Sequence, residues 1–254
     1  MRGHRLRMGL AVPPALAASF SPARVAGLTL WLKSDAIGGL ADGDPVASWP
    51  DMSGRGGRDL SQATAGKRPA FRTNVVNGKP AVRFDGVDDF LATANLFGSA
   101  LFAADQADIF VALRQDSTKA NQVLFSWDGT ANRVTIGVDD GGQIKFDHPT
   151  NDVTGRISVA QPASWEDNWH VIECYRNGNA DSAIYIDGAS RVTGAQTTAL
   201  NLTRSMPLVL GDYQADGGWQ FKGDVLEVII YSRSLTAIER ANVTGYLKAR
   251  AGVA

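Results

Sequence analysis

Residues 77–91 restrict the fold more than any other part of this sequence. Pro80, Val82 and Phe84 recur at every second position, which is the period of a strand with one buried face. Asp85-Gly86 then supplies a turn pair that tolerates positive φ, and Phe90-Leu91 resumes the apolar pattern behind two acidic residues. The stretch therefore predicts a strand, a tight corner and a second strand.

The acidic residues point to the same class of structure. Only four of the 26 acidic residues are glutamates, and aspartate favours turns whereas glutamate favours helices. Together with 27 glycines, this composition is typical of many short strands joined by tight loops. At 254 residues and 44% hydrophobic, the chain is long enough for one large β domain or two small ones with a sizeable core.

Strand and turn signals continue along the chain. Residues 108–113 are apolar on both faces, which predicts an interior strand, and hairpins are expected around residues 139–142 and 177–179. The pattern changes at Thr236-x-x-Glu239, a capping box that opens a helix. One face of this helix is expected to contain Ile238, Ala241, Tyr246 and Leu247. About a dozen strands without βαβ alternation indicate an all-β, two-sheet antiparallel jelly-roll sandwich with one C-terminal helix.

Residues 1–26 differ from the rest, and we expect them to form an extended arm beside one sandwich domain, residues 27–254. Three arginines precede the apolar residues 8–18, which superficially resemble a signal peptide, but Pro13-Pro14 interrupts so short an apolar stretch. An arm of this length is ordered only if something holds it. It packs either on its own domain or on a neighbouring subunit, and docking on a neighbour is our working hypothesis.

Four groups of motifs follow one another in order. They are Trp49-x-Asp51-x-Ser53-Gly54, Asn77-Gly78-x-Pro80-Ala81-Val82-x-Phe84-Asp85-Gly86, Trp169-His170 with Tyr185-Ile186-Asp187-Gly188, and Phe221-x-Gly223-Asp224-x-x-Glu227-Val228 with Tyr231, Leu235, Glu239-Arg240 and Tyr246-Leu247. Together they resemble a concanavalin A-like lectin/glucanase domain of the laminin-G-like type over residues 27–250. The resemblance implies two curved antiparallel sheets and, in many members, a ligand or calcium site on the rim or concave face. Because this fold serves lectins, adhesion modules, hydrolases and structural subunits, it does not define a function.

Catalysis is not expected from these residues. A retaining glycosidase needs two carboxyl groups about 5 Å apart, and the acidic-x-acidic spacing occurs only at Asp42-Gly43-Asp44, in a loop context. The three histidines, His4, His148 and His170, are dispersed, and no Gly-x-Ser-x-Gly nucleophile elbow occurs. Glu227 lies in the most apolar predicted strand, and we interpret it as a structural carboxylate, paired with Arg233 or Arg240.

Net charge and hydropathy restrict the classes of partner that we expect. A formal charge of −1 gives no long-range attraction to nucleic acid or to an anionic bilayer, and no apolar run approaches the ~20 residues of a membrane helix. Neither nucleic acid nor a membrane is therefore expected as a partner. The single cysteine, Cys174, cannot form an internal disulfide, which leaves the redox compartment open.

The aspartate-rich loops suggest a metal. Three histidines and one cysteine, apart in sequence, make a zinc site improbable, whereas calcium takes oxygen ligands. The best calcium candidates are Asp85, Asp88 and Asp89, with Asp212 or Asp224 as a further ligand. The alternative is that these residues are turn and cap residues, which aspartate favours without any ion.

Sugar recognition combines an exposed aromatic face with nearby polar side chains for the hydroxyl groups. Two loops have this composition, residues 127–129 and residues 212–219. The second loop is the better candidate because its glycines leave the aromatic residues accessible. The candidate ligand-binding residues are Trp127 and Asp128 in the first loop, and Asp212, Tyr213, Gln214 and Trp219 in the second. The alternative is that the aromatic residues cap the core at strand ends.

These observations favour a non-enzymatic, lectin-like recognition or structural subunit of a larger assembly. The resemblance implies an extracellular or virion-surface setting, such as a phage virion or a bacterial surface particle, because both carry such domains. Other protein subunits are expected to be contacted through residues 1–26, with surface glycans as ligands. The first alternative is a free, calcium-dependent glycan-binding module. The second is a carbohydrate-active enzyme whose catalytic pair is not visible in the sequence.

Overall fold

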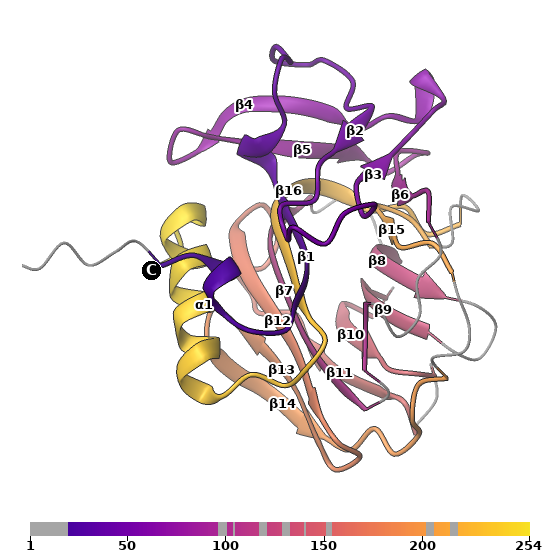
Figure 1. Cartoon of the computed structure of the whole chain (residues 1–254), viewed down its shortest axis with the longest axis vertical. Helices are drawn as coiled ribbons and strands as arrows, with labels where there is room; N and C mark the ends of the chain where they lie inside the picture. The colour runs from indigo at the N-terminus through magenta and orange to yellow at the C-terminus, as the bar shows by residue number, and fades with distance from the viewer. Residues whose placement is uncertain are drawn as a thin grey trace, which may run out of the picture.

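The computed structural model describes residues 20–95, 101–103, 105–116, 121–128, 133–139, 141–150, 154–201, 206–213 and 218–254. Over these residues the chain forms two antiparallel sheets of eight strands each and one C-terminal α-helix (Figure 1). The predicted all-β sandwich with a single C-terminal helix is thereby confirmed. Three short 3-10 helices, η1 (Pro22–Arg24), η2 (Ser34–Ala36) and η3 (Ala65–Lys67), lie in the connections.

The first sheet carries the helix on its outer face. Its order is β14-β13-β12-β7-β16-β5-β4, and β1 pairs with β16 as well. Its strands are β1 (Leu28–Lys33), β4 (Ala70–Val76), β5 (Lys79–Asp85), β7 (Gln106–Gln115), β12 (Trp169–Asn177), β13 (Asp181–Ile186), β14 (Ala189–Gly194) and β16 (Lys222–Tyr231). The apolar run at residues 108–113 lies in β7 between β12 and β16, so the predicted interior strand is confirmed.

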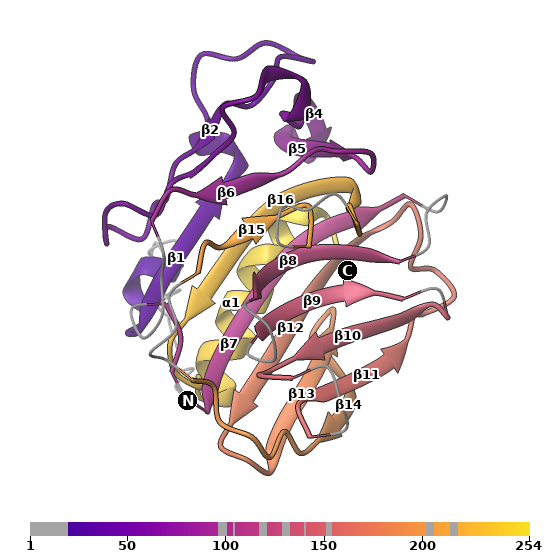
Figure 2. The same cartoon turned by 90° about the vertical axis from the view of Figure 1, so that its right-hand side faces the viewer.

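The second sheet has the order β11-β10-β9-β8-β15-β6-β3-β2. Its strands are β2 (Ser48–Trp49), β3 (Leu60–Ser61), β6 (Leu91–Thr93), β8 (Gln122–Asp128), β9 (Arg133–Val138), β10 (Gln143–Asp147), β11 (Arg156–Ala160) and β15 (Val209–Leu210). The β9–β10 and β12–β13 pairs are the two hairpins that the turn residues predicted. Figure 2 shows β8 to β11 side by side, with the first sheet and the helix behind them.

Residues 77–91 connect the two sheets. β5 ends at Asp85, Gly86 turns with φ 76°, and the chain then enters β6 of the opposite sheet. The predicted strand, tight corner and second strand are therefore confirmed. The corner is the point at which the chain passes from one sheet to the other. Val82 and Phe84 point into the core between the sheets, as their two-residue spacing predicts.

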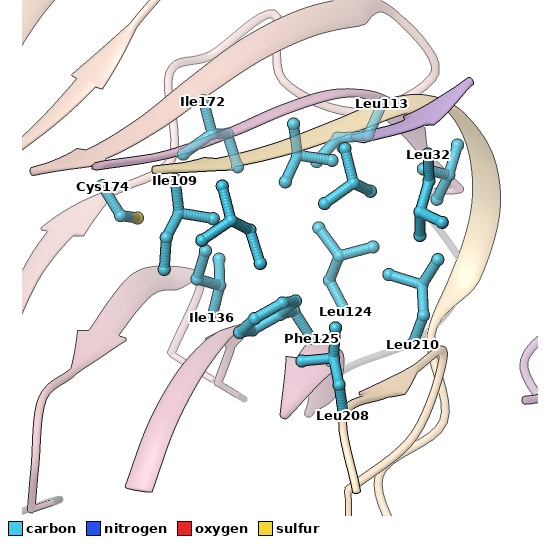
Figure 3. Packing of buried hydrophobic residues seen from close by; sticks show 14 of the residues in the cluster. Leu32, Ile109, Leu113, Leu124, Phe125, Ile136, Ile172, Cys174, Leu208 and Leu210 are labelled. Carbon is cyan, nitrogen blue, oxygen red and sulfur yellow. The ribbon is translucent and has the colours of Figure 1, made fainter. Parts of the chain in front are cut away.

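The main core fills the space between the sheets. Ile109 and Leu113 from β7 face Leu124, Phe125 and Ile136 from the second sheet (Figure 3). All of these side chains are almost fully excluded from water, so their burial is the dominant contribution to the stability of the sandwich.

Helix α1 (Ala237–Ala251) covers the outer face of the first sheet. Thr236 caps it through the backbone N–H of Glu239, and the Glu239 side chain accepts from the N–H of Thr236, which is the predicted capping box. The predicted buried face was partly wrong, since Ile238 is 76% exposed and Ala241 is also exposed. The residues that pack on the sheet are Val243, Leu247 and Ala251, with Tyr246 partly buried beside them.

The chain packs against this helix layer before β1 begins. Phe20 stacks at a tilt on Tyr246 with 5.9 Å between ring centroids, and the Tyr231 hydroxyl donates to the Pro22 carbonyl at 3.0 Å. Residues 1–19, which make up most of the expected arm, lie outside the described residues. In the described part of the chain, no helix has the length and apolar character needed to cross a membrane.

Candidate functional site

A groove lies on the outer face of the second sheet. It has a volume of about 240 Å³ and crosses strands β8 to β11, with the segment after β15 forming one wall. Among the described residues, its lining consists of Gln122, Val123, Arg133, Thr135, Gly137, Val138, Lys145, Asp147, Arg156, Tyr213 and Trp219. We refer to it as the β8–β11 groove. Strand alternation explains its polarity, because Val134 and Ile136 face the core while Arg133 and Thr135 face outward.

A row of three polar side chains crosses the floor of the groove. Strand register places Thr135 of β9 opposite Asp147 of β10, and Asp147 opposite Arg156 of β11. Arg156 donates from Nε and Nη2 to the two oxygens of Asp147, at 2.6 and 2.7 Å. This bidentate geometry holds both side chains in fixed positions.

Thr135 has an unpartnered hydroxyl at the floor of the groove. The residue is 6% exposed, and its Oγ1 forms no hydrogen bond within the described part of the chain. A buried hydroxyl without a partner costs free energy.

The ionisable side chains around this floor shift one another's pKa values. Burial raises the pKa of Asp147, while the hydrogen bonds and charge of Arg156 oppose that rise. Burial also acts to raise the pKa of Asp139, but the Lys145 ammonium at 2.7 Å and backbone N–H groups lower it on balance. Hydrogen bonding to Asp147 raises the pKa of Arg156, so this guanidinium stays cationic.

Two aromatic rings form a wall of the groove. The ring centroids of Tyr213 and Trp219 lie 6.3 Å apart at an interplanar angle of 41°, and Trp219 is 44% exposed. The Trp219 carbonyl accepts from the N–H of Val123 at 2.7 Å, which fixes this segment to the start of β8. The Arg133 guanidinium lies 5.4 Å from the centre of the Tyr213 ring, so the wall and the floor are in contact.

The structure separates the predicted sugar-binding residues into two groups. Tyr213 and Trp219 line the groove, as the loop composition suggested. Trp127 is fully buried and packs on Phe102 with 5.4 Å between ring centroids, so its ring does not face a ligand. Asp212 is 1% exposed and accepts from the N–H of Tyr213, which gives it a structural role in that segment.

The side chains of two further predicted residues lie outside what the structure describes. The backbone of Asp128 pairs with Arg133 at the end of β8. Gln214 lies outside the described residues. Sequence reasoning also missed Thr135, Lys145 and Arg156, although the alternation along β9, β10 and β11 was sufficient to place them on the outward face.

The predicted calcium residues lie close together. The carboxylates of Asp85, Asp88 and Asp89 have oxygens within 4.8 Å of one another, at the corner between the two sheets. Asp85 also accepts from the N–H of Val87 at 2.7 Å, and Asp89 from the N–H of Asp85 at 2.9 Å, as turn residues do. Burial, with the neighbouring Asp85 and Asp88 charges, raises the pKa of Asp89 to about 6.

The two suggested additional calcium ligands are used otherwise. Asp224 is 1% exposed and receives a bidentate contact from Arg83, at 2.7 and 3.0 Å, and a further contact from Arg114. Asp212 accepts from the N–H of Tyr213 and is not one of the carboxylates that lie within 4.8 Å of one another. The acidic cluster at the corner therefore consists of three carboxylates among the described residues.

The carboxylates and the histidine considered for catalysis have structural partners. Asp42 accepts from the N–H of Thr73, and Asp44 from the N–H of Ala41. His170 is held between Asp187 at 2.7 Å and the Ser164 carbonyl at 3.1 Å.

Glu227 is structural as predicted, but both suggested partners were wrong. Its partners are Arg250 and the indole N–H of Trp31, each at 2.5 Å. Arg233 pairs with Glu239, and Arg240 pairs with Glu173.

Comparison with known proteins gives one family. A family model described as the concanavalin A-like lectin/glucanases superfamily matches residues 108–239. No curated protein sequence matches the chain significantly.

Solved structures share the fold. The binding domain of botulinum neurotoxin serotype D matches with a TM-score of 0.59 and 12% identity, covering 86% of this chain and 50% of that chain. A second match is domain 4 of AbnA, a GH43 extracellular arabinanase from Geobacillus stearothermophilus, in complex with arabinotriose. Its TM-score is 0.58 at 14% identity, and the match covers 87% of this chain and 98% of that chain.

The binding domain of botulinum neurotoxin DC, in complex with rat synaptotagmin II, matches with a TM-score of 0.57 and 12% identity, covering 89% of this chain and 52% of that chain. This chain thus spans about half the length of the toxin binding domains that it matches. At these identities the likeness concerns the fold alone.

Proposed function

The chain belongs to the concanavalin A-like lectin/glucanase superfamily, and we propose that it is a non-enzymatic, carbohydrate-recognising subunit of a larger assembly. The observation that carries the recognition part is the β8–β11 groove, in which the partly exposed Trp219 ring stands at the wall beside a floor of polar side chains. A sugar would satisfy both, since it offers hydroxyl groups to the floor and C–H faces to the ring. Domain 4 of the arabinanase, which shares this fold, was solved with arabinotriose bound.

The charges of the groove argue for binding without catalysis. Among its lining residues in the described part of the chain, Asp147 is the only carboxylate, and Arg156 engages both of its oxygens. Glycoside hydrolysis requires a pair of carboxyl groups, one acting as acid and the other as nucleophile or base. We therefore rank a carbohydrate-active enzyme below a lectin.

Binding to a panel of immobilised oligosaccharides tests the recognition function. We expect the full chain to bind at least one member, and Trp219→Ala to weaken that binding about fivefold, because an aromatic contact contributes about 1 kcal/mol. Met52→Ala, which removes an exposed side chain of comparable exposure outside the groove, is the matched control and should bind normally. Failure of the full chain to bind any oligosaccharide would refute the proposal.

The assembly part of the proposal concerns residues 1–26. Phe20, the first described residue, packs on Tyr246 of α1, on a surface where a neighbouring subunit could be reached. A phage virion or a bacterial surface particle would suit such an arrangement. Light scattering on the full chain and on a chain that starts at Ala26 tests it. An assembled full chain with a folded, monomeric short form supports the arm, whereas two monomers argue against self-assembly through it.

A calcium-dependent, free glycan-binding module is the second candidate. The specific observation in its favour is the group of three carboxylates at the corner of residues 85–89. Calcium takes carboxylate oxygens, and sites with few protein ligands bind it at about 10⁻⁴ to 10⁻³ M in extracellular modules. Loss of glycan binding on addition of a chelator would favour this candidate over the assembly subunit.

A further inference from the structure

The outer face of helix α1 carries no charge. A helix at a protein surface usually turns its charged residues toward water and its apolar residues toward the core. In α1, which is described over its whole length, Ile238 is 76% exposed, so an apolar side chain stands where a charged one is expected. Depletion of charged residues is typical of the centre of a protein–protein interface. The exposed residues of the helix are Ala237, Ile238, Ala241, Asn242, Gly245 and Ala249.

A groove of about 620 Å³ runs along one flank of this face, between α1 and the turn after β13. We refer to it as the α1 groove. The helix contributes Ala237, Ala241, Gly245 and Ala249, which recur every four residues, and the turn contributes Gly188. Because these side chains are methyl groups or hydrogen atoms, the backbone of another segment can approach the helix closely.

The charged residues of α1 are held by this chain and do not point to a free ligand. Each of them is half-buried, and each has a partner along the flanks of the helix. Asp187, which also lines the groove, holds His170. Covering the outer face therefore takes no free charge out of water. The pairs are Glu239 with Arg233, Arg240 with Glu173, Lys248 with the Asp187 carbonyl, and Arg250 with Glu227.

The described part of the chain does not require a glycine at position 245. Gly245 lies inside the helix, and a β-carbon placed on it would meet no atom within 4 Å. Glycine is less favourable than alanine in a helix interior, so its presence in the middle of the exposed face costs stability. A segment that lies close over the helix explains it, because a side chain here would keep that segment away.

We propose that residues 8–18 of a neighbouring copy of this chain bind in the α1 groove. This inference rests on the assembly part of the proposed function and names the surface that receives the N-terminal segment. Residues 8–18 contain no charged residue and include Leu10, Val12 and Leu16, so they match an uncharged surface of small side chains. Eleven extended residues reach about 36 Å, and α1 is about 22 Å long, so the segment can follow the helix from end to end.

The place where the described chain begins favours a neighbour as the source of this segment. Phe20 packs on Tyr246, which faces Glu227 of β16, whereas the α1 groove opens on the other flank of the helix, next to β13. The two residues between position 18 and Phe20 span at most about 7 Å, which is less than the width of a helix, about 10 Å. Residues 8–18 of the same chain therefore cannot lie along its own groove, but those of a second copy can.

Light scattering on the full chain and on two altered forms tests the proposal. We expect the full chain to assemble, and a chain that starts at Phe20, which keeps every described residue, to be monomeric. Gly245→Gln should also be monomeric, because its side chain occupies the groove. Glutamine is a better helix former than glycine, so Gly245→Gln should unfold at the same temperature as the chain that starts at Phe20, or higher. Gly66→Gln, at an exposed glycine of η3 whose β-carbon would also meet no atom within 4 Å, is the matched control and should assemble normally.

Mixing the two altered forms tests whether the segment comes from a neighbour. Gly245→Gln keeps residues 8–18 but has a blocked groove, whereas the chain that starts at Phe20 has an open groove and lacks the segment. Neither should assemble alone, and together they should form a complex that contains both.

The outcomes separate this inference from the proposed function. Assembly that is lost on removal of residues 1–19 but kept in Gly245→Gln overturns the α1 groove as the receiving surface and leaves the assembly subunit standing. A mixture of the two altered forms that stays monomeric overturns binding between neighbours. A full chain that is itself monomeric overturns this inference together with the assembly part of the proposed function.

Discussion

Arg250 of helix α1 donates a 2.5 Å hydrogen bond from Nε to Oε2 of Glu227 on strand β16. Glu227 is fully buried in the first sheet, and the Arg250 side chain is 11% exposed. Burial raises the pKa of this carboxyl, while the Arg250 charge and the hydrogen bond from Trp31 oppose the rise. The pair thus links the last turns of the helix to the centre of the sheet that the helix covers.

We predict that Arg250→Met lowers the free energy of unfolding by about 3 kcal/mol, because it leaves a buried carboxylate without its cation. Arg72→Met is the matched control, since Arg72 pairs with Asp42 at 3.3 Å on the surface, with side chains 36% and 48% exposed. Such a pair contributes about 1 kcal/mol or less. Urea unfolding of both variants measures the difference, and equal losses would contradict the structural role of the Glu227 pair.

Stability should also depend on the protonation of Glu173. This residue is 3% exposed beneath α1 and accepts from Arg240, and burial raises its pKa from 4.5 to about 7. Between those two values the folded state holds a proton that the unfolded state has released. Stability therefore falls as pH rises from about 5 to about 7, by at most about 1.4 kcal/mol per pH unit from this group.

Glu173→Gln should flatten that slope, as measured by urea unfolding at a series of pH values. The buried Asp108, whose pKa burial and the Glu173 charge raise, contributes a slope of the same sign that remains in the variant. Glu166→Gln changes an exposed glutamate and should retain the slope of the unmodified chain. A slope unchanged in Glu173→Gln would show that Glu173 does not titrate in this range.

The fold could be predicted because its signals are local. Alternation at Val82 and Phe84, the Asp85-Gly86 turn and the Thr236 capping box each depend on residues a few positions apart. The partner of Glu227 could not be predicted, because any of three arginines near the C-terminus could neutralise its carboxylate. Only the helix position on the sheet brings Arg250, and not Arg233 or Arg240, to the buried carboxylate.

The candidate site could be predicted only in part, because contacts between residues far apart in the sequence form it. The loop composition identified Tyr213 and Trp219 in the favoured loop, but it also included Trp127, which shares the inward face of β8 with Phe125. Alternation alone assigns Thr135 to the outward face of β9. It does not show that the segment after β15 packs at this place and turns a flat sheet surface into a groove, because that contact joins residues far apart in the sequence.

Calcium remains a prediction, and it is testable through stability. If Asp85, Asp88 and Asp89 bind calcium with a Kd of about 10⁻⁴ to 10⁻³ M, 10 mM calcium stabilises the folded state by about 1.4 to 2.7 kcal/mol. Thermal unfolding with calcium and with a chelator measures this difference. Asp88→Asn should abolish it, whereas Asp59→Asn, an exposed aspartate outside the cluster, should not. An unfolding temperature that calcium leaves unchanged would exclude a site of this affinity.

The Thr135 hydroxyl offers the sharpest separation of binding from folding. Because its Oγ1 has no partner in the described part of the chain, Thr135→Val should leave the free energy of unfolding unchanged or raise it slightly. The same substitution should weaken ligand binding by about 1 kcal/mol, about fivefold in Kd, because it removes a hydrogen bond that a ligand would form.

Thr29→Val is the control for this substitution. The Thr29 hydroxyl is hydrogen-bonded to the Leu101 carbonyl at 3.0 Å and placed 3.1 Å from the Ile230 carbonyl, so its removal should cost about 1 kcal/mol or more of stability without altering affinity. Urea unfolding and titration calorimetry on the two variants measure both quantities. If Thr135→Val binds as tightly as the unmodified chain, the hydroxyl is not a ligand contact and the floor of the groove does not recognise the ligand through it.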